Sequence, residues 1–135
     1  MPNRASGPFE VKLTPQPLAE APADSGLARM AISKQFHGAL EATSVGEMLT
    51  AMSTSVQGSG SYVAVERVTG KLGDRSGSFA LQHTGVMNRG VPQLSITVVP
   101  DSGTGELTGL SGKLEIRIEA GGKHFYDFEY ELPAQ

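Results

Sequence analysis

Glu66, His83 and Tyr62 are the residues best suited to proton-transfer chemistry, because they supply a carboxyl, an imidazole and a phenol. All three fall within one alternating segment, residues 62–85, YVAVERVTGKLGDRSGSFALQHTG. If this segment folds as a hairpin around Gly73-Asp74, Glu66 and His83 become diagonal neighbours roughly 7 Å apart at the backbone. An apolar surround would raise the pKa of Glu66 and a nearby His83 would offset that rise, so the carboxyl is tunable as a general acid or base.

The register of the hairpin follows from its turn. Glycine at the first central position, Gly73, suits a two-residue type II′ turn. Counting outward from it predicts the pairs Leu72 with Arg75, Val68 with Phe79, Glu66 with Leu81, Ala64 with His83 and Tyr62 with Gly85. A slip of one residue would mix polar and apolar side chains on both faces, so this register is favoured.

Further polar residues share the inward face. Alternation at the end of the chain adds His124, Tyr126 and Tyr130, and less regular stretches add Lys34, Ser44 and Thr50. In the functional interpretation Glu66 is the acid or base and His83 its partner. The residues that would hold a ligand are Tyr62, Tyr126, Tyr130, Phe79 and His124. The competing interpretation is a buried Glu–His or Glu–Lys pair that only satisfies itself, with the aromatic stripe as ordinary core.

Composition limits the classes of protein to consider. The 135 residues form one domain, expected at residues 8–132 after a loose N-terminus at residues 1–7. Cysteine is absent, which excludes disulfides and thiolate chemistry. The net charge is -3 without a basic cluster, so nucleic-acid binding is not expected. No apolar run has the ~20 residues of a membrane span and no signal peptide is recognisable, so a soluble cytoplasmic protein is expected.

Neither a metal nor a cofactor is predicted. His37, His83 and His124 are far apart in the sequence and show no metal-ligand spacing. Gly103 and Gly105 begin a glycine motif whose third position is Thr108, and the strand–turn–helix unit that cradles phosphate is missing.

The remaining sequence predicts short strands separated by turns. Strands are expected at residues 9–13, 27–36, 39–52, 94–98, 114–119 and 124–132, and the hairpin should end near Val86. Loops are expected at residues 14–26, 88–92 and 101–112, the last with one helical turn in residues 105–110. Residues 39–52 could also form a helix, but β-branched residues favour a strand with Gly46 as a bend or bulge. An odd loop or bulge around Gly121-Gly122 keeps the last two strands in phase.

Eight strands in hairpin order predict an all-β fold, a closed eight-stranded antiparallel up-and-down barrel, because closure removes the two edges of an open sheet. About eight strands enclose either a filled core or room for one small ligand.

Three stretches carry a family resemblance: YVAVERVTGKLGDRSGSFALQHTG, VVPDSGTGELTGLSG and HFYDFEYEL. They resemble the bacterial family called Domain of Unknown Function 3224, over about Phe9 to Leu132. The resemblance implies a barrel similar to allene oxide cyclase, a cofactor-independent plant enzyme that cyclises a fatty-acid epoxide inside its barrel. It supplies no catalytic motif. The oligomeric habit of the plant enzyme makes a homo-oligomer an expectation, with Val63, Val65 and Ala80 as an outward apolar patch.

Three functions follow. The first is a barrel that binds a small, largely apolar molecule and isomerises or cyclises it without a cofactor. The second is a binding or carrier module without chemistry. The third is an assembly protein that acts through its outer face. An enclosed cavity of ~300 Å³ or more with Glu66 on its wall would support the first, and a solidly filled barrel would remove it.

Overall fold

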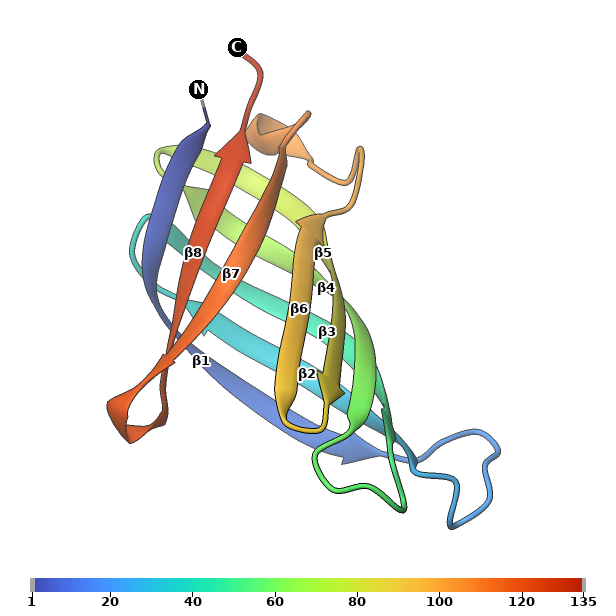
Figure 1. Ribbon diagram of the computed structural model, residues 1–135. Coiled ribbons are helices and arrows are strands. Elements are labelled where there is room, and N and C mark those ends of the chain that lie inside the picture. Colours follow the sequence, from blue (N-terminus) through green and yellow to red (C-terminus); the bar gives the residue numbers. More distant parts are fainter. Residues whose placement is uncertain (1, 135) are drawn as a thin grey trace.

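Eight antiparallel strands close into one barrel, as predicted (Figure 1). The computed structural model describes residues 2–134. Each strand pairs with the next one along the chain, and β1 also pairs with β8. The strands are β1 Asn3–Gln16, β2 Leu27–Phe36, β3 Leu40–Met52, β4 Gly60–Leu72, β5 Arg75–Asn88, β6 Val91–Val98, β7 Ser111–Glu119 and β8 Lys123–Glu131. Two short 3₁₀ helices, η1 Gly105–Leu107 and η2 Ala120–Gly122, lie in the last two connections.

The β4–β5 hairpin has the predicted register at every pair. Leu72 pairs with Arg75, Glu66 with Leu81 and Ala64 with His83. Gly73 has a φ of 63°, as the first central residue of a type II′ turn requires. The alternation of the sequence therefore fixes which residues of this hairpin face the interior.

The prediction of a loose N-terminus is wrong for residues 3–7. These residues belong to β1 and pair with β8, so the barrel begins at Asn3 rather than at residue 8. The sequence Ser6-Gly7-Pro8 suggests coil, but the structure requires a glycine at position 7 because another strand end packs against it. A Cβ at Gly7 would lie 2.2 Å from the carbonyl oxygen of His37, so only glycine lets the strand pass there.

The predicted loop at residues 14–26 is shorter, because β1 continues to Gln16 and leaves residues 17–26 as the connection. Pro15 suggested an interruption of the strand. Beyond Phe9, however, β1 pairs with β2 alone and is an edge strand, where a missing N–H is tolerated.

Residues 40–52 form the predicted strand rather than a helix, but Gly46 makes no bulge. The pairing of β3 with β2 and β4 runs through it without interruption. A Cβ at Gly46 would lie 2.1 Å from the carbonyl oxygen of Val65. The glycine therefore allows β3 and β4 to approach closely.

Three other connections can be compared with their predictions, and one of them differs. Residues 88–92 are not a loop: Arg89 and Gly90, with φ of 50° and 89°, make a two-residue turn between longer strands. The odd loop expected near Gly121 is confirmed, since the three residues of η2 place Ile118 opposite His124. The helical turn expected in residues 105–110 is present as η1.

One end of the barrel, here called the filled end, is packed with buried side chains. It lies at the top of Figure 1, beside both termini and η1. The side chains that fill it are Phe36, Leu40, Leu72, Phe79, Leu107, Leu110, Tyr126 and Phe128, each at most 2 % exposed. Leu107 and Leu110 come from the β6–β7 connection, which thereby closes this end.

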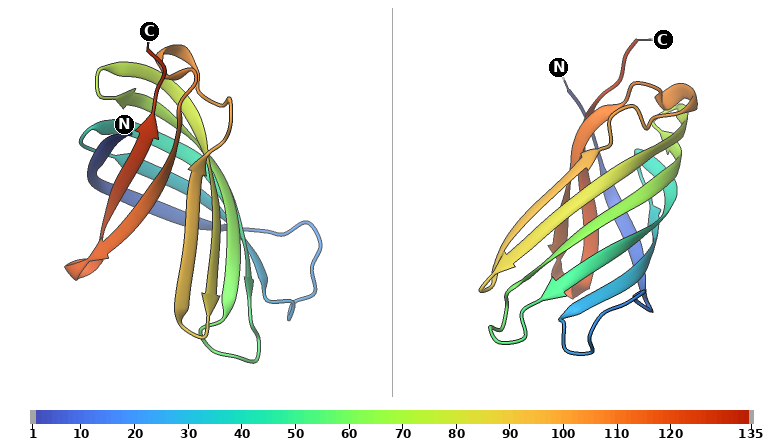
Figure 2. Two further views of the ribbon diagram at one scale, coloured as in Figure 1. Left: turned by 45° about the horizontal axis from the view of Figure 1, so that its top comes forward. Right: turned by 90° about the vertical axis from the view of Figure 1, so that its right-hand side faces the viewer.

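The opposite end, here called the open end, carries loops 17–26 and 53–59 and the turn at Arg89-Gly90 (Figure 2). Apolar side chains that face inward by strand parity remain exposed there: Leu13 at 45 %, Leu94 at 46 % and Ile118 at 67 %. Strand pairing is also weak beside them, because β6 and β7 share only the pair Thr97 with Lys113. Below that pair the two strands diverge (Figure 1).

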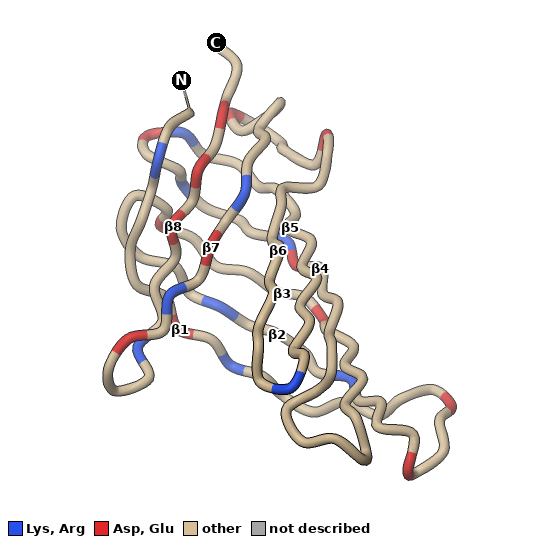
Figure 3. The backbone as a smooth tube through the Cα atoms, in the orientation of Figure 1, with Lys and Arg blue, Asp and Glu red and all other residues tan. Residues whose placement is uncertain are grey.

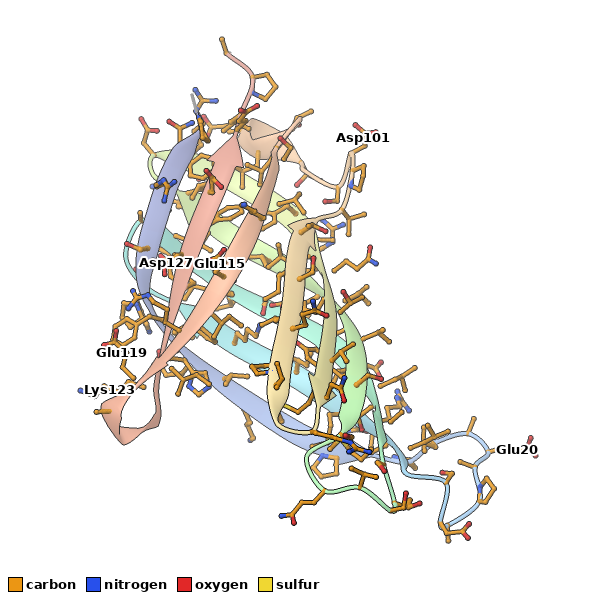
Figure 4. All side chains as sticks on the ribbon, viewed as in Figure 1. Glu20, Asp101, Glu115, Glu119, Lys123 and Asp127 are labelled. Carbon is orange, nitrogen blue, oxygen red and sulfur yellow. The ribbon has the colours of Figure 1, made fainter. Side chains whose placement is uncertain are left out.

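Charged residues are spread over the strands and loops (Figure 3). On the outer face, Glu115 of β7 lies beside Asp127 of β8 (Figure 4). Arg117 binds Asp127 with an Nε–Oδ2 distance of 2.6 Å. The buried charged residues include Lys34 and Glu66. Within residues 2–134, neither 3₁₀ helix has the length to cross a membrane.

Candidate functional site: a buried carboxylate network

Glu66 lies at the centre of a network of polar side chains inside the barrel. Its Oε2 is 2.8 Å from Nζ of Lys34 and 2.5 Å from Nε2 of His83. Its Oε1 accepts a hydrogen bond of 2.7 Å from the hydroxyl of Ser44. Glu66, His83 and Ser44 are each 2 % exposed. We call these residues, together with Tyr62, the Glu66 network.

Four neighbouring strands supply this network. Glu66 of β4 and His83 of β5 are the predicted diagonal neighbours, because His83 pairs with Ala64. Lys34 comes from β2 and must cross β3 to reach Glu66. Gly46, directly opposite Glu66 on β3, carries no side chain that would block this path. The absence of a side chain at Gly46 thus lets the ammonium of Lys34 reach the carboxylate of Glu66.

Opposing effects set the pKa of Glu66. Burial favours the neutral acid, but the hydrogen bond with His83 and the charge and hydrogen bond of Lys34 outweigh it and lower the pKa to about 2. The carboxylate is therefore ionised at neutral pH and only accepts hydrogen bonds. Nε2 of His83 must then carry a proton that it donates to Glu66.

Tyr62 extends the network toward the open end. Its hydroxyl is 3.3 Å from Nδ1 of His83. The ring lies over Gly85, where a Cβ would be 2.3 Å from Cε1 of the tyrosine. Burial and the charge of Glu66 raise the pKa of Tyr62, so it stays a phenol. With the imidazole neutral, Nδ1 is an acceptor and the Tyr62 hydroxyl donates to it.

Tyr126 lies in the filled end, and its hydroxyl is bound to the backbone. It accepts a hydrogen bond from the N–H of Leu40 at 2.9 Å and donates to the carbonyl of His37 at 2.7 Å. Burial raises the pKa of this phenol. Tyr126 therefore holds the β2–β3 turn against β8, and a role in ligand binding stays a prediction.

The other predicted ligand residues pack among aromatic rings. Phe79 stacks on Phe128 with a centroid distance of 5.8 Å, and Tyr130 stacks on Phe128 at 5.2 Å. His124 meets the edge of Phe9 at 5.4 Å. The structure thus brings Tyr62, Glu66 and His83 together, while the ligand contacts predicted for Phe79, Tyr130 and His124 stay predictions.

Sequence reasoning placed Lys34 and Ser44 on the inner face and gave neither a role at a ligand. A lysine was considered only as a partner of Glu66, in the competing interpretation of a buried Glu–Lys pair. The signal for Lys34 was an interrupted apolar pattern, Ile32-x-Lys34-x-Phe36, on a buried strand face. Nζ of Lys34 lies 5.5 Å from the ring centroid of Phe9, so its charge also meets an aromatic face. Sequence reasoning gave the methionines of the open end no role in a site.

Glu66 is shielded from the outer surface. Of five hollows of about 310 to 490 Å³ in the described part of the chain, none has Glu66 on its wall. One of about 310 Å³ lies over the outer face of β2 to β5, beside Leu49, Val63 and Val65, and touches His83. No group of three or more His, Asp or Glu side chains among residues 2–134 is placed to hold a metal ion.

Comparison with known proteins gives the family but no activity. The family model "Protein of unknown function (DUF3224)" matches residues 5–130. A crystal structure of a protein with unknown function from the DUF3224 family of Shewanella oneidensis MR-1 is 49 % identical, with 100 % of both chains covered and a TM-score of 0.92. No match is found among curated proteins. The chain belongs to the DUF3224 family.

Proposed function

We propose that the protein binds a small, largely apolar molecule in the lumen of the barrel at the open end. The observation that carries this proposal is the exposure of inward-facing side chains there: Leu13 at 45 %, Leu94 at 46 % and Ile118 at 67 %. Exposed apolar side chains that face the interior of a barrel provide a surface that a small apolar ligand can cover.

The free energy of burying apolar surface favours binding of an apolar molecule there. Apolar surface gains roughly 25 cal/mol for each Å² that leaves water, and this lining is held in place by the strands before a ligand arrives. Binding would therefore bury an existing surface without folding a new one. The filled end offers no such gain, because Phe79 and Phe128 are already 1 % exposed.

The Glu66 network supports the same proposal as the polar floor of the site. Lys34, Ser44 and His83 already satisfy the Glu66 carboxylate. Tyr62 is half-buried on the side of the open end. A ligand would thus meet apolar walls and one phenol, the combination that fixes orientation in small-molecule sites.

A matched pair of variants tests the site. Leu94 at 46 % and Val63 at 52 % are similarly exposed aliphatic residues, the first facing inward at the open end and the second on the outer face. Native mass spectrometry of the purified protein, alone and with added 1-naphthol, should show a bound small molecule. Leu94→Asp should lose it and Val63→Asp should keep it. Equal retention by both variants, or loss in Val63→Asp alone, would contradict a lumen site.

Proton transfer to the bound molecule is the second candidate function, and the chain Tyr62–His83–Glu66 favours it. The Tyr62 oxygen takes a proton from the ligand while its own hydroxyl proton passes to Nδ1 of His83, and the ionised Glu66 stabilises the imidazolium that forms. The reverse transfer returns a proton to the ligand. Glu66 itself, with a pKa of about 2, holds no proton to donate at neutral pH. This arrangement moves the acid-base role predicted for Glu66 to its two neighbours.

Deuterium exchange separates chemistry from binding alone. The bound molecule, incubated with the protein in heavy water, should gain carbon-bound deuterium if the site enolises or isomerises it. Tyr62→Phe should abolish the exchange while the molecule stays bound. Binding without any deuterium uptake by the wild-type protein would reject catalysis and leave a carrier.

A further inference from the structure

We infer that the open-end site selects flat aromatic molecules over saturated molecules of the same size, an inference that rests on the proposed function. It comes from the methionines. The chain has five, and the four after Met1 are Met30, Met48, Met52 and Met87. All four lie on the inward-facing register positions of β2, β3 and β5 at the open end.

The strand register groups these thioethers in two rows across the inner wall. Met30 pairs with Met48, Met48 with Ala64, and Ala64 with His83, which forms one continuous row. Met30 and Met48 are half-buried. Ala64, between Met48 and His83, carries only a methyl group and is 5 % exposed.

The second row lies nearer the mouth of the lumen. Met52 pairs with Gly60, and Gly60 pairs with Met87. Met52 is 53 % exposed and Met87 is 40 % exposed. Because Gly60 has no side chain, the two methionines can extend over it toward one another. A flat molecule that enters the open end would therefore pass one row of thioethers and reach the other.

Between the rows stands Tyr62, paired with Thr50 on one side and Gly85 on the other. Its phenol supplies one hydrogen-bonding group at the depth of the first row. A fused aromatic ring with a single hydroxyl or carbonyl group therefore matches both features. The ring would lie against Met30 and Met48 and the oxygen would meet Tyr62.

Methionine accounts for the selectivity. The thioether is polarisable and unbranched, so it adapts its shape to the ligand and makes favourable sulfur–aromatic contacts at ~5 Å from the ring. A saturated ring system forgoes these contacts but retains the same apolar area. Leucine at these positions would provide area without the sulfur contacts. Shape tolerance and aromatic preference are thus both expected from the composition of the wall.

The test compares 1-naphthol with 1-decalol, its saturated counterpart, by isothermal titration calorimetry on the full-length protein. The wild-type protein should bind 1-naphthol about tenfold more tightly, a ratio that one or two sulfur–aromatic contacts can supply. The double variant Met30→Leu, Met48→Leu should reduce this ratio to about one and still bind both compounds. Val63→Leu, on the outer face, is the control and should keep the wild-type ratio.

Each outcome separates the two proposals. Equal affinity of the wild-type protein for both compounds, or an unchanged preference in the double variant, would overturn the aromatic selectivity and leave the ligand site in place. Failure of the wild-type protein to bind either compound would overturn both. Circular dichroism of every variant shows whether a loss of binding is instead a loss of fold.

Discussion

The filled end and the open end are built from the same alternating strands, but they differ in what lies between the strands. At the filled end, Phe79 and Phe128 stack in the interior, and η1 adds Leu107 as a plug. At the open end the inward positions hold flexible methionines, and the wall parts between β6 and β7. One end of the barrel is therefore close-packed, while the other leaves inward-facing apolar side chains exposed.

The largest difference in stability is expected between a side-chain truncation at the filled end and one at the open end. Phe79→Ala should lower the free energy of unfolding by about 3–5 kcal/mol, because it leaves a cavity in a close-packed interior. Ile118→Ala, at 67 % exposure, should change it by less than about 0.5 kcal/mol. Urea denaturation measures both. Equal costs at the two positions would mean that the open end is packed as tightly as the filled one.

Loss of the buried carboxylate should be nearly as costly. Glu66→Ala should destabilise the protein by about 3–5 kcal/mol, because it leaves the ammonium of Lys34 buried without its partner. The double variant Lys34→Met, Glu66→Leu removes both charges and should recover most of that loss. If the double variant is no more stable than Glu66→Ala, the ion pair is not what the single substitution breaks.

Acid should weaken the network within a defined pH window. The carboxyl group of Glu66 has a pKa of about 2 in the folded protein and an ordinary value of 4.5. Because the folded value is lower, the associated stability is fully present above pH 4.5 and is lost as the pH falls toward 2. The loss should be on the order of 3 kcal/mol. A carbon-13 titration of the Glu66 carboxyl, assigned with Glu66→Gln, measures this pKa, and a midpoint near 4.5 would refute the depression.

Removing the hydroxyl group from each of two tyrosines of β8 should give a smaller difference in stability. Tyr126→Phe removes the bonds to Leu40 and His37 and leaves a buried N–H unpaired, so it should cost about 1–3 kcal/mol. Tyr130→Phe keeps its stacking on Phe128 and should cost less than about 0.5 kcal/mol. Thermal unfolding compares them directly. A larger loss at Tyr130 would reverse the assignment of the structural hydroxyl.

Local patterns were enough to predict the barrel and half of the network. Glu66 and His83 belong to one hairpin, so counting from Gly73 placed them together without knowledge of other strands. Lys34 required more. Its contact with Glu66 depends on the register of β2, β3 and β4 at once, and on a strand whose Gly46 suggested a bulge that does not form.

The difference between the two ends could not be predicted from alternation, because both ends alternate alike. It depends on long-range features: the return of Leu107 and Leu110 to the interior, and the single β6–β7 pair at Thr97. Both arise from the connection at residues 99–110, whose glycines indicated turns but not where the chain would pack. The bonds of Tyr126 to the β2–β3 turn likewise join distant parts of the chain, so alternation could not predict them.

The most direct test follows the methyl groups of the protein in solution. Carbon-13 methyl spectra of methionine- and valine-labelled protein, recorded during titration with 1-naphthol, report the site residue by residue. The resonances of Met30 and Met48 should shift with a common saturation curve, while those of Val63 and Val65 on the outer face stay in place. Shifts confined to Val63 and Val65, with the methionines unchanged, would place the ligand outside the barrel and contradict a binding site at the open end.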